Sequence, residues 1–226
     1  MANSQFLSSE QSRELWDSHA KNQELKPELW TNLTEVELQY MSRLDTAKSV
    51  CVAAAGDGLS GFQVFHKVSK DCKIIVGDLS PERVKLAKLW FTRNGIEIND
   101  SCSNITVQIM DNQDLPIESG SCDRYISNLS IMLVPEPLKQ LEEAYRILEE
   151  GGIAALSTWG REEYSTFFTL PTKVAFEMGI KLPARRSPFF LGDEKDMQIK
   201  MKEVGFTKVF TYYNTVYEKV YGDAAE

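Results

Sequence analysis

The stretch Ser49–Phe62, SVCVAAAGDGLSGF, decides the fold. Its first half is a run of small and β-branched apolar residues, as in a strand that is buried on both faces of a parallel sheet. Its second half places Gly56, Gly58 and Gly61 in the spacing G-x-G-x-x-G, which is typical of a tight turn from a strand into a helix. Small residues let the backbone approach a ligand, so the stretch predicts a site for an adenosine-containing cofactor, with a ligand-free turn as the alternative.

Strand and helix patterns alternate after this turn. The expected strands are Val50–Ala55, Lys73–Gly77, Ile105–Met110, Arg124–Asn128 and Ile153–Thr158, with helices between them at about 60–68, from Ser80-Pro81 and from Pro137. The expected helix N-caps are Ser9, Ser80 and Asp193. The sequence FTKVFTYYNTVYEKV, residues 206–220, alternates like one or two closing strands. We therefore expect an α/β fold: a Rossmann-like, seven-stranded, mostly parallel sheet with helices on both faces, an N-terminal helical cap and an insertion after the fifth strand.

This pattern predicts one domain over residues 1–226. Within it we expect an N-terminal helical cap (1–46), a cofactor-binding core (47–160), a substrate-side insertion (161–192), and a closing helix and strands (193–226).

The composition limits the kinds of partner, metal site and cellular location that we expect. A net charge of −8 would repel a polyanionic backbone, so we expect no nucleic-acid partner. The four cysteines form no C-x-x-C pair, which predicts no metal site. Neither a signal peptide nor a membrane-spanning run is visible, so we expect a cytoplasmic protein. The oligomeric state is left open.

Polar residues follow the second and third expected strands. Asp78 lies about 20 residues beyond the glycines, where a carboxylate can accept hydrogen bonds from ribose hydroxyls. Its alternative role is to stabilise the start of the following helix. Asp111 and Asn112 end the third strand; there the Asp111 carboxylate could accept from an adenine amino group and the Asn112 backbone could face a ring nitrogen.

These motifs together resemble the class I S-adenosyl-L-methionine (SAM)-dependent methyltransferases, especially the small-molecule branch that includes quinone and sterol methyltransferases. The resemblance covers about 50–160 and resumes at MKEVGFTKVF, and its carriers are VCVAAAGDG, VGDLS, DNQDLPIESGSCDRYISNLSIMLV and LEEAYRILEEGGIAALSTWG. Two positions depart from the family pattern: Val52 stands where an acidic residue is usual, and Ala54 replaces the first glycine.

The resemblance implies a role for each matching position. The methionine part of SAM would lie against Ala54, Ala55, Gly56, Asp57 and Gly58; Asp78 would bind the ribose, Leu79 would pack beside the adenine, Asp111 and Asn112 would bind the adenine edge, and Asn128 and Leu129 would lie near the sulfonium.

Methyl transfer by in-line displacement needs alignment more than a catalytic base, so a base is optional. Only two histidines exist, and we expect His66 to be structural and His19 to be the candidate base. The acceptor is expected to be a small molecule, and its pocket residues would be Trp16, His19, Tyr40, Trp159 and Tyr164; ordinary packing is the alternative for each.

Two other functions are compatible with the sequence. Val52 and the lack of an evident base would suit a non-catalytic binding or scaffolding protein with the SAM-binding fold. The glycine spacing alone would suit an NAD-dependent oxidoreductase.

Overall fold

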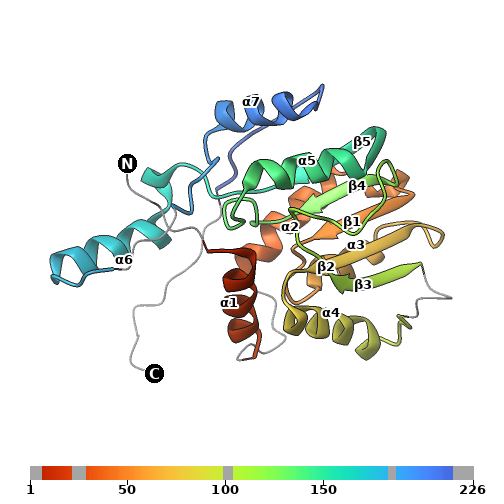
Figure 1. The fold of residues 1–226 in the computed structure, drawn as a ribbon, viewed down its shortest axis with the longest axis horizontal. Coiled ribbons are helices and arrows are strands. Elements are labelled where there is room, and N and C mark those ends of the chain that lie inside the picture. Colours follow the sequence, from red (N-terminus) through yellow and green to blue (C-terminus); the bar gives the residue numbers. More distant parts are fainter. Residues whose placement is uncertain (1–6, 22–28, 99–103, 183–186, 216–226) are drawn as a thin grey trace.

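The computed structural model describes residues 7–21, 29–98, 104–182 and 187–215, and only the backbone of 29–33. Its centre is a parallel sheet of five strands in the order β3-β2-β1-β4-β5 (Figure 1). The strands are β1 (Ser49–Ala53), β2 (Lys73–Asp78), β3 (Ile105–Ile109), β4 (Cys122–Ser127) and β5 (Leu148–Leu156). The α-helices are α1 (Ser9–Lys21), α2 (Leu29–Met41), α3 (Leu59–Phe65), α4 (Pro81–Arg93), α5 (Pro137–Ile147), α6 (Thr166–Glu177) and α7 (Glu194–Val204), and two short 3-10 turns are η1 (Leu44–Thr46) and η2 (Glu162–Tyr164).

The strand order creates a switch point beside β1. The chain runs outward from β1 to β2 and β3, then returns to the other side of β1 for β4 and β5. In open parallel sheets the crevice at such a reversal, beyond the carboxyl ends of the strands, is where ligands bind.

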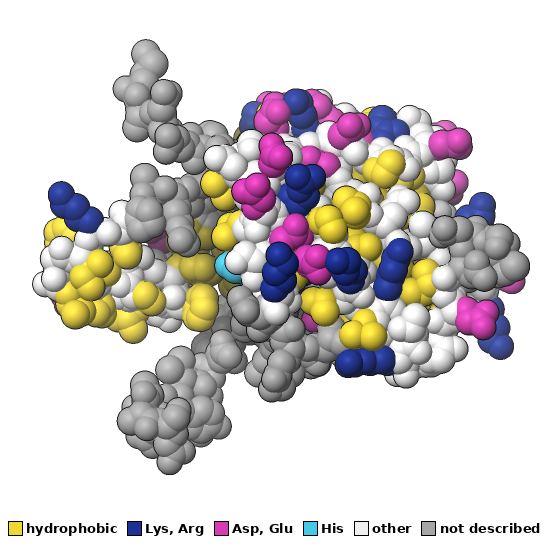
Figure 2. All heavy atoms as spheres, turned by 60° about the horizontal axis from the view of Figure 1, so that its bottom comes forward, with side chains coloured by type: hydrophobic (Ala, Val, Ile, Leu, Met, Phe, Trp, Pro, Cys, Tyr) yellow, Lys and Arg dark blue, Asp and Glu magenta, His cyan; other side chains and the backbone are white. Residues whose placement is uncertain are grey.

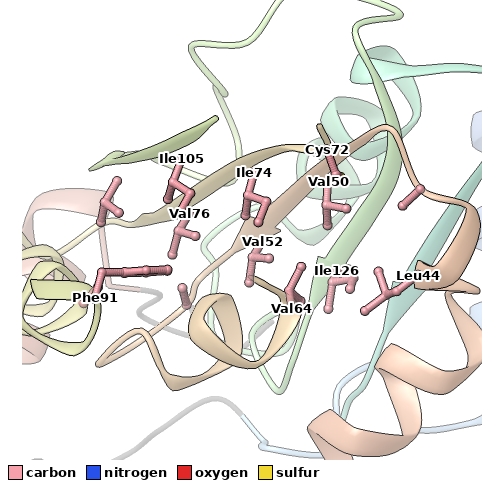
Figure 3. Packing of buried hydrophobic residues seen from close by; sticks show 14 of the residues in the cluster. Leu44, Val50, Val52, Val64, Cys72, Ile74, Val76, Phe91, Ile105 and Ile126 are labelled. Carbon is pink, nitrogen blue, oxygen red and sulfur yellow. The ribbon is translucent and has the colours of Figure 1, made fainter. Parts of the chain in front are cut away.

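One face of the sheet packs on α3 and α4. Val50 and Val52 of β1 lie beside Ile74 and Val76 of β2 and pack on Val64 of α3 (Figure 3). All five side chains are at most 2% exposed. Alternate residues of β1 point here, so Val52 is part of the core.

The opposite face packs on α5. Cys51 and Tyr125 lie on this side with Ala144 and Ile147 of α5. The outer helix α7 then covers α5, where Met197 and Met201 contact Leu141. Helices cover both faces, as the sequence predicted.

Polar side chains begin three of the helices. Ser80 accepts from the Arg83 amide at 3.1 Å ahead of Pro81, and Asp193 accepts from the amides of Lys195 and Asp196. Both caps confirm the sequence prediction. The start of α1 is set by Ser8, one residue earlier than the expected cap: its Oγ accepts from the Gln11 amide, while the Gln11 side chain accepts from the Ser8 amide.

The expected seven strands are not found among the described residues, where the sheet has five. Residues 206–215 have no strand pairing. They are held by side chains instead, since Tyr213 donates to the Gly192 carbonyl and Gln198 donates to Thr211. Alternating apolar residues form a strand only when a neighbour offers its backbone, and here none does. The rest of the predicted closing segment, 216–220, lies outside the described residues.

The insertion after β5 contains a helix that the sequence did not reveal. Pro171 lies inside α6, and an internal proline normally argues against a helix because it removes one backbone hydrogen bond. The helix stands away from the sheet, at the left of Figure 1.

Candidate cofactor and acceptor site

The glycine turn lies at the carboxyl end of β1, beside the switch point. Gly58 has φ +93°, and a Cβ there would lie 2.4 Å from the Cα of Ala87 in α4. A Cβ on Gly61 would lie 2.5 Å from Val76. Gly56 has φ +58°, and a Cβ there would meet only the Arg83 guanidinium, at 3.8 Å. Gly58 and Gly61 thus serve helix packing, while Gly56 leaves open space above the turn.

Asp78 joins this turn to the end of β2. Its Oδ2 accepts from the Gly56 amide at 2.9 Å, and its Oδ1 accepts from the Ser80 amide at 3.0 Å. The side chain is 9% exposed. Burial raises the pKa of Asp78, and the hydrogen bonds from Ser80 and Gly56 and the charge of Arg83 partly oppose that rise. A carboxylate has about four acceptor sites, so these amides leave acceptor capacity for hydroxyl donors such as those of a ribose.

The residues after β3 come next along the same edge. Asp111 Oδ1 accepts from the backbone amide of Gln113 at 2.9 Å and from its side-chain amide at 3.1 Å. Asn112 is buried, with 5% of its surface exposed, and Leu79 is partly buried next to Asp78.

The end of β4 forms a small polar cluster with the residue that follows β5. Leu129 has φ +50°, and its amide donates to Ser157 Oγ at 2.9 Å. Ser157 in turn donates to Asn128 Oδ1 at 2.5 Å. This fixes the side chain of Asn128 where β4 faces the switch point.

Helix α1 lies along the edge formed by β2 and β3, beside α4 (Figure 1). Asp17 accepts from the Ser80 hydroxyl and, at 3.3 Å, from the Glu82 amide. The Gln113 side chain donates to Ser9 at 3.1 Å, and the Arg83 guanidinium lies 5.6 Å from the Trp16 ring centre. These contacts make α1 a cover over the Asp78–Asp111 edge.

The predicted cofactor residues therefore share one edge of the sheet, but two sequence departures change the site. Val52 is 1% exposed and packs in the core, so its side chain does not reach the turn. Ala54 adopts φ +52°, a left-handed conformation that costs an alanine about 1 kcal/mol. The polar groups at this edge still fit an adenosine cofactor. The buried carboxylate of Asp78, the uncrowded Gly56 and further hydrogen-bond acceptors lie together there.

The predicted acceptor residues do not form one pocket among the described residues. Trp16 and His19 contact each other on α1, with ring centres 5.5 Å apart. Trp159 packs on Phe168 of α6, 5.0 Å away. Tyr40 and Tyr164 are 82% and 69% exposed.

The insertion instead presents two surfaces. Phe168 also packs on Phe189, and beside this aromatic group lies an open hollow of about 380 Å³. It is lined by Arg161, Glu163, Phe189, Gly192, Asp193 and Tyr213. Figure 2 shows hydrophobic side chains gathered on α6, where Phe167, Leu170 and Val174 are 63%, 58% and 43% exposed.

Several residues around the site were missed from the sequence. Asp17 and Gln113 act through contacts with segments more than 60 residues away, which no local pattern reveals. Glu35 is a charged residue that is 3% exposed, and the local sequence TEVELQ (34–39), in which polar and apolar residues alternate, does not signal that burial.

The fold is a doubly wound α/β sheet, and this edge carries the polar groups that an adenosine cofactor would need. Residues 53–156 match the sequence model of the family described as Methyltransferase domain. This match agrees with the class predicted from the motifs: over these residues the chain is similar to SAM-dependent methyltransferase domains. No helix among the described residues is long and apolar enough to cross a membrane.

Individual proteins agree with this class. The chain is 27% identical over 133 residues to 2-methyl-6-phytyl-1,4-hydroquinone methyltransferase 1, chloroplastic, of Oryza sativa subsp. japonica, covering 58% of this chain and 37% of that protein. This chain therefore spans little more than a third of that relative. A SAM-dependent methyltransferase from Aquifex aeolicus has a similar structure, with a TM-score of 0.59 and 18% identity over 88% of each chain. The [4+2]-cyclase SpnF also shares the fold, with a TM-score of 0.64 and 15% identity over 88% of this chain and 73% of its own.

Proposed function

We propose that this protein is a SAM-dependent methyltransferase that acts on a small apolar acceptor. The observation that carries the proposal is the pair of hydrogen bonds from Gly56 and Ser80 to Asp78, which joins the glycine turn to the carboxylate after β2. The family match over residues 53–156 favours SAM over NAD for this shared geometry.

Each residue has a distinct task in this proposal. The free acceptor sites of Asp78 bind the ribose hydroxyls, with Leu79 beside the adenine, and Asp111 and Asn112 bind its edge. The backbone of 54–58 holds the methionine part, and Asn128 and Leu129 lie near the sulfur. When bound, SAM would supply a methyl group on a sulfonium, and the neutral thioether S-adenosylhomocysteine would be the leaving group. The protein then aligns the acceptor with that methyl and excludes water.

For the acceptor we propose a hydroquinone-like ring with an apolar tail. The support is the name of the Oryza relative together with the aromatic group of Trp159, Phe168 and Phe189. The exposed apolar side chains of α6 extend this surface. Trp16 on α1, Tyr40 on α2 and Tyr164 in the insertion join the pocket only if these three segments approach each other, and His19 is the candidate proton acceptor.

The cofactor is tested by calorimetric titration with S-adenosylhomocysteine, using NADH as the negative control. Wild type should bind the former only, and Asp78→Asn should weaken binding by about 1–3 kcal/mol, the scale for losing an acceptor of buried hydrogen bonds. Asp123→Asn is a matched control, because the buried Asp123 accepts from the amides of Lys48 and Ser49 at the opposite edge of the sheet. Equal losses in both variants would contradict the ribose assignment.

Turnover is tested with methyl-labelled SAM and hydroquinones with and without an isoprenoid tail. Label should appear in the acceptor, faster with the tailed compounds. Cofactor binding without methyl transfer to any of these hydroquinones would favour the non-catalytic alternative. The fold alone does not decide between the two, since SpnF is a cyclase with this fold.

A further inference from the structure

A buried carboxyl group lies between α2 and α3, next to the glycine turn. Glu35 of α2 is 3% exposed. Its Oε1 accepts from Gln39 Nε2 at 2.9 Å and from the Ser60 hydroxyl at 2.6 Å. Its Oε2 is also buried and has no hydrogen-bond partner among the described residues.

The nearby cation does not pair with this carboxyl. Lys67 donates to Gln39 Oε1 at 2.6 Å, and no ion pair involving Glu35 occurs in the described part of the chain. Burial raises the pKa of Glu35, and the hydrogen bonds from Ser60 and Gln39 and the charge of Lys67 oppose the rise. An acid that is buried with one oxygen unpaired is costly, and a bound cation beside that oxygen would offset the cost.

The position of Glu35 indicates which cation this is. Ser60, its hydrogen-bond donor, is two residues beyond Gly58 and follows the turn directly. The strand position that would otherwise present a carboxylate to this turn holds Val52, whose side chain is in the core. A different element, α2, therefore brings a carboxyl to the first residues of α3, which follow this turn.

We propose that Glu35 binds the amino group of the cofactor's methionine moiety, in place of a carboxylate from β1. The inference rests on the proposed function, since it assumes a SAM-type ligand at the turn. The ligand ammonium donates to Oε2, while Ser60 and Gln39 hold Oε1 and fix the orientation of the carboxyl. Glu35 thereby selects ligands that carry the amino-acid part.

The test compares two ligands that differ in that part. S-adenosylhomocysteine contains it, whereas 5′-methylthioadenosine keeps the adenosine and thioether but lacks the amino acid. Both are titrated calorimetrically into wild type, Glu35→Gln and Glu37→Gln. Glu37 is the matched control: it lies on the same helix but contacts Asn214.

Glu35→Gln should lower the affinity for S-adenosylhomocysteine at least tenfold and change that for 5′-methylthioadenosine less than twofold. Glu37→Gln should leave both affinities unchanged. Retained 5′-methylthioadenosine binding also shows that the variant keeps a folded turn.

Other outcomes separate the two proposals. Unchanged S-adenosylhomocysteine affinity in Glu35→Gln, or equal loss for both ligands, would overturn the role of Glu35 and leave the proposed function standing. If wild type bound neither ligand, the proposed function would fail, and the role of Glu35 with it.

Discussion

Two buried carboxyl groups flank the glycine turn, and their partners differ. Asp78 receives a backbone hydrogen bond on each oxygen, and these bonds partly offset the rise in its pKa that burial causes. Within the described part of the chain, Glu35 receives hydrogen bonds on one oxygen only. Without a ligand, the carboxyl of Glu35 therefore has fewer of its oxygens hydrogen-bonded than that of Asp78.

This difference predicts how stability depends on pH. The folded pKa of Glu35 is raised, so the folded state binds more protons than the unfolded chain above the unfolded pKa of about 4.3. The contribution of protonated Glu35 to the free energy of unfolding is consequently lost as pH rises through its folded pKa. Glu35→Gln lacks this loss, so its stability relative to wild type should increase in urea unfolding as pH rises above the unfolded pKa and through the folded pKa. Parallel pH profiles for the two proteins would contradict the burial of a titrating Glu35.

Ala54 gives a second prediction at this scale. Its left-handed φ of +52° strains an alanine but not a glycine. Ala54→Gly should raise the free energy of unfolding by about 1 kcal/mol in urea denaturation. The adjacent Ala55 has no positive φ, so Ala55→Gly should lower it by about 0.5–1 kcal/mol. Destabilisation by both changes would contradict the strain at Ala54.

Among the elements, the glycine turn allows a close approach of α3 to α4 at Gly58. Gly58→Ala would place a Cβ 2.4 Å from the Ala87 backbone in addition to the strain of φ +93°, and should destabilise the protein by about 3 kcal/mol. Gly95→Ala, at φ +72° with no atom within 4 Å of the added Cβ, should cost only about 1 kcal/mol. Equal midpoint shifts in urea would show that α3 and α4 can separate without loss.

At the scale of the molecule, α1 closes the cofactor edge through few contacts. Asp17 binds the start of α4, Gln113 binds Ser9, and Arg83 lies over Trp16, with little buried apolar surface on the helix itself. Elements held in this way open locally at low free energy. A ligand beneath α1 adds contacts only in the closed state and so favours closure.

Saturating S-adenosylhomocysteine should therefore slow amide hydrogen exchange in residues 9–21, measured by mass spectrometry. Helix α7 is the internal control, because it packs on α5 and is remote from the turn. Trp16→Ala should reduce the protection of α1 while leaving α7 unchanged. Ligand-independent exchange in α1 would show that it does not cover the bound cofactor.

The sequence determined the parts that depend on local patterns. Apolar runs, the Ser80 and Asp193 caps and the glycine spacing gave the five strands and most helices, because each is encoded within a few residues. The order of residues at the strand ends likewise predicted which side chains share the cofactor edge, since parallel strands end together.

Other features of the fold depend on contacts between residues that are distant in the sequence, and only the tertiary structure shows them. Residues 206–215 alternate like a strand but pair with no strand among the described residues, and α6 forms although it contains Pro171. The pairing of Asp17 with α4 and of Glu35 with Ser60 joins segments 25 or more residues apart. Sequence periodicity specifies which face of an element is apolar, but only the packed chain specifies what that face meets, and for this reason the carboxyl absent from β1 is found on α2.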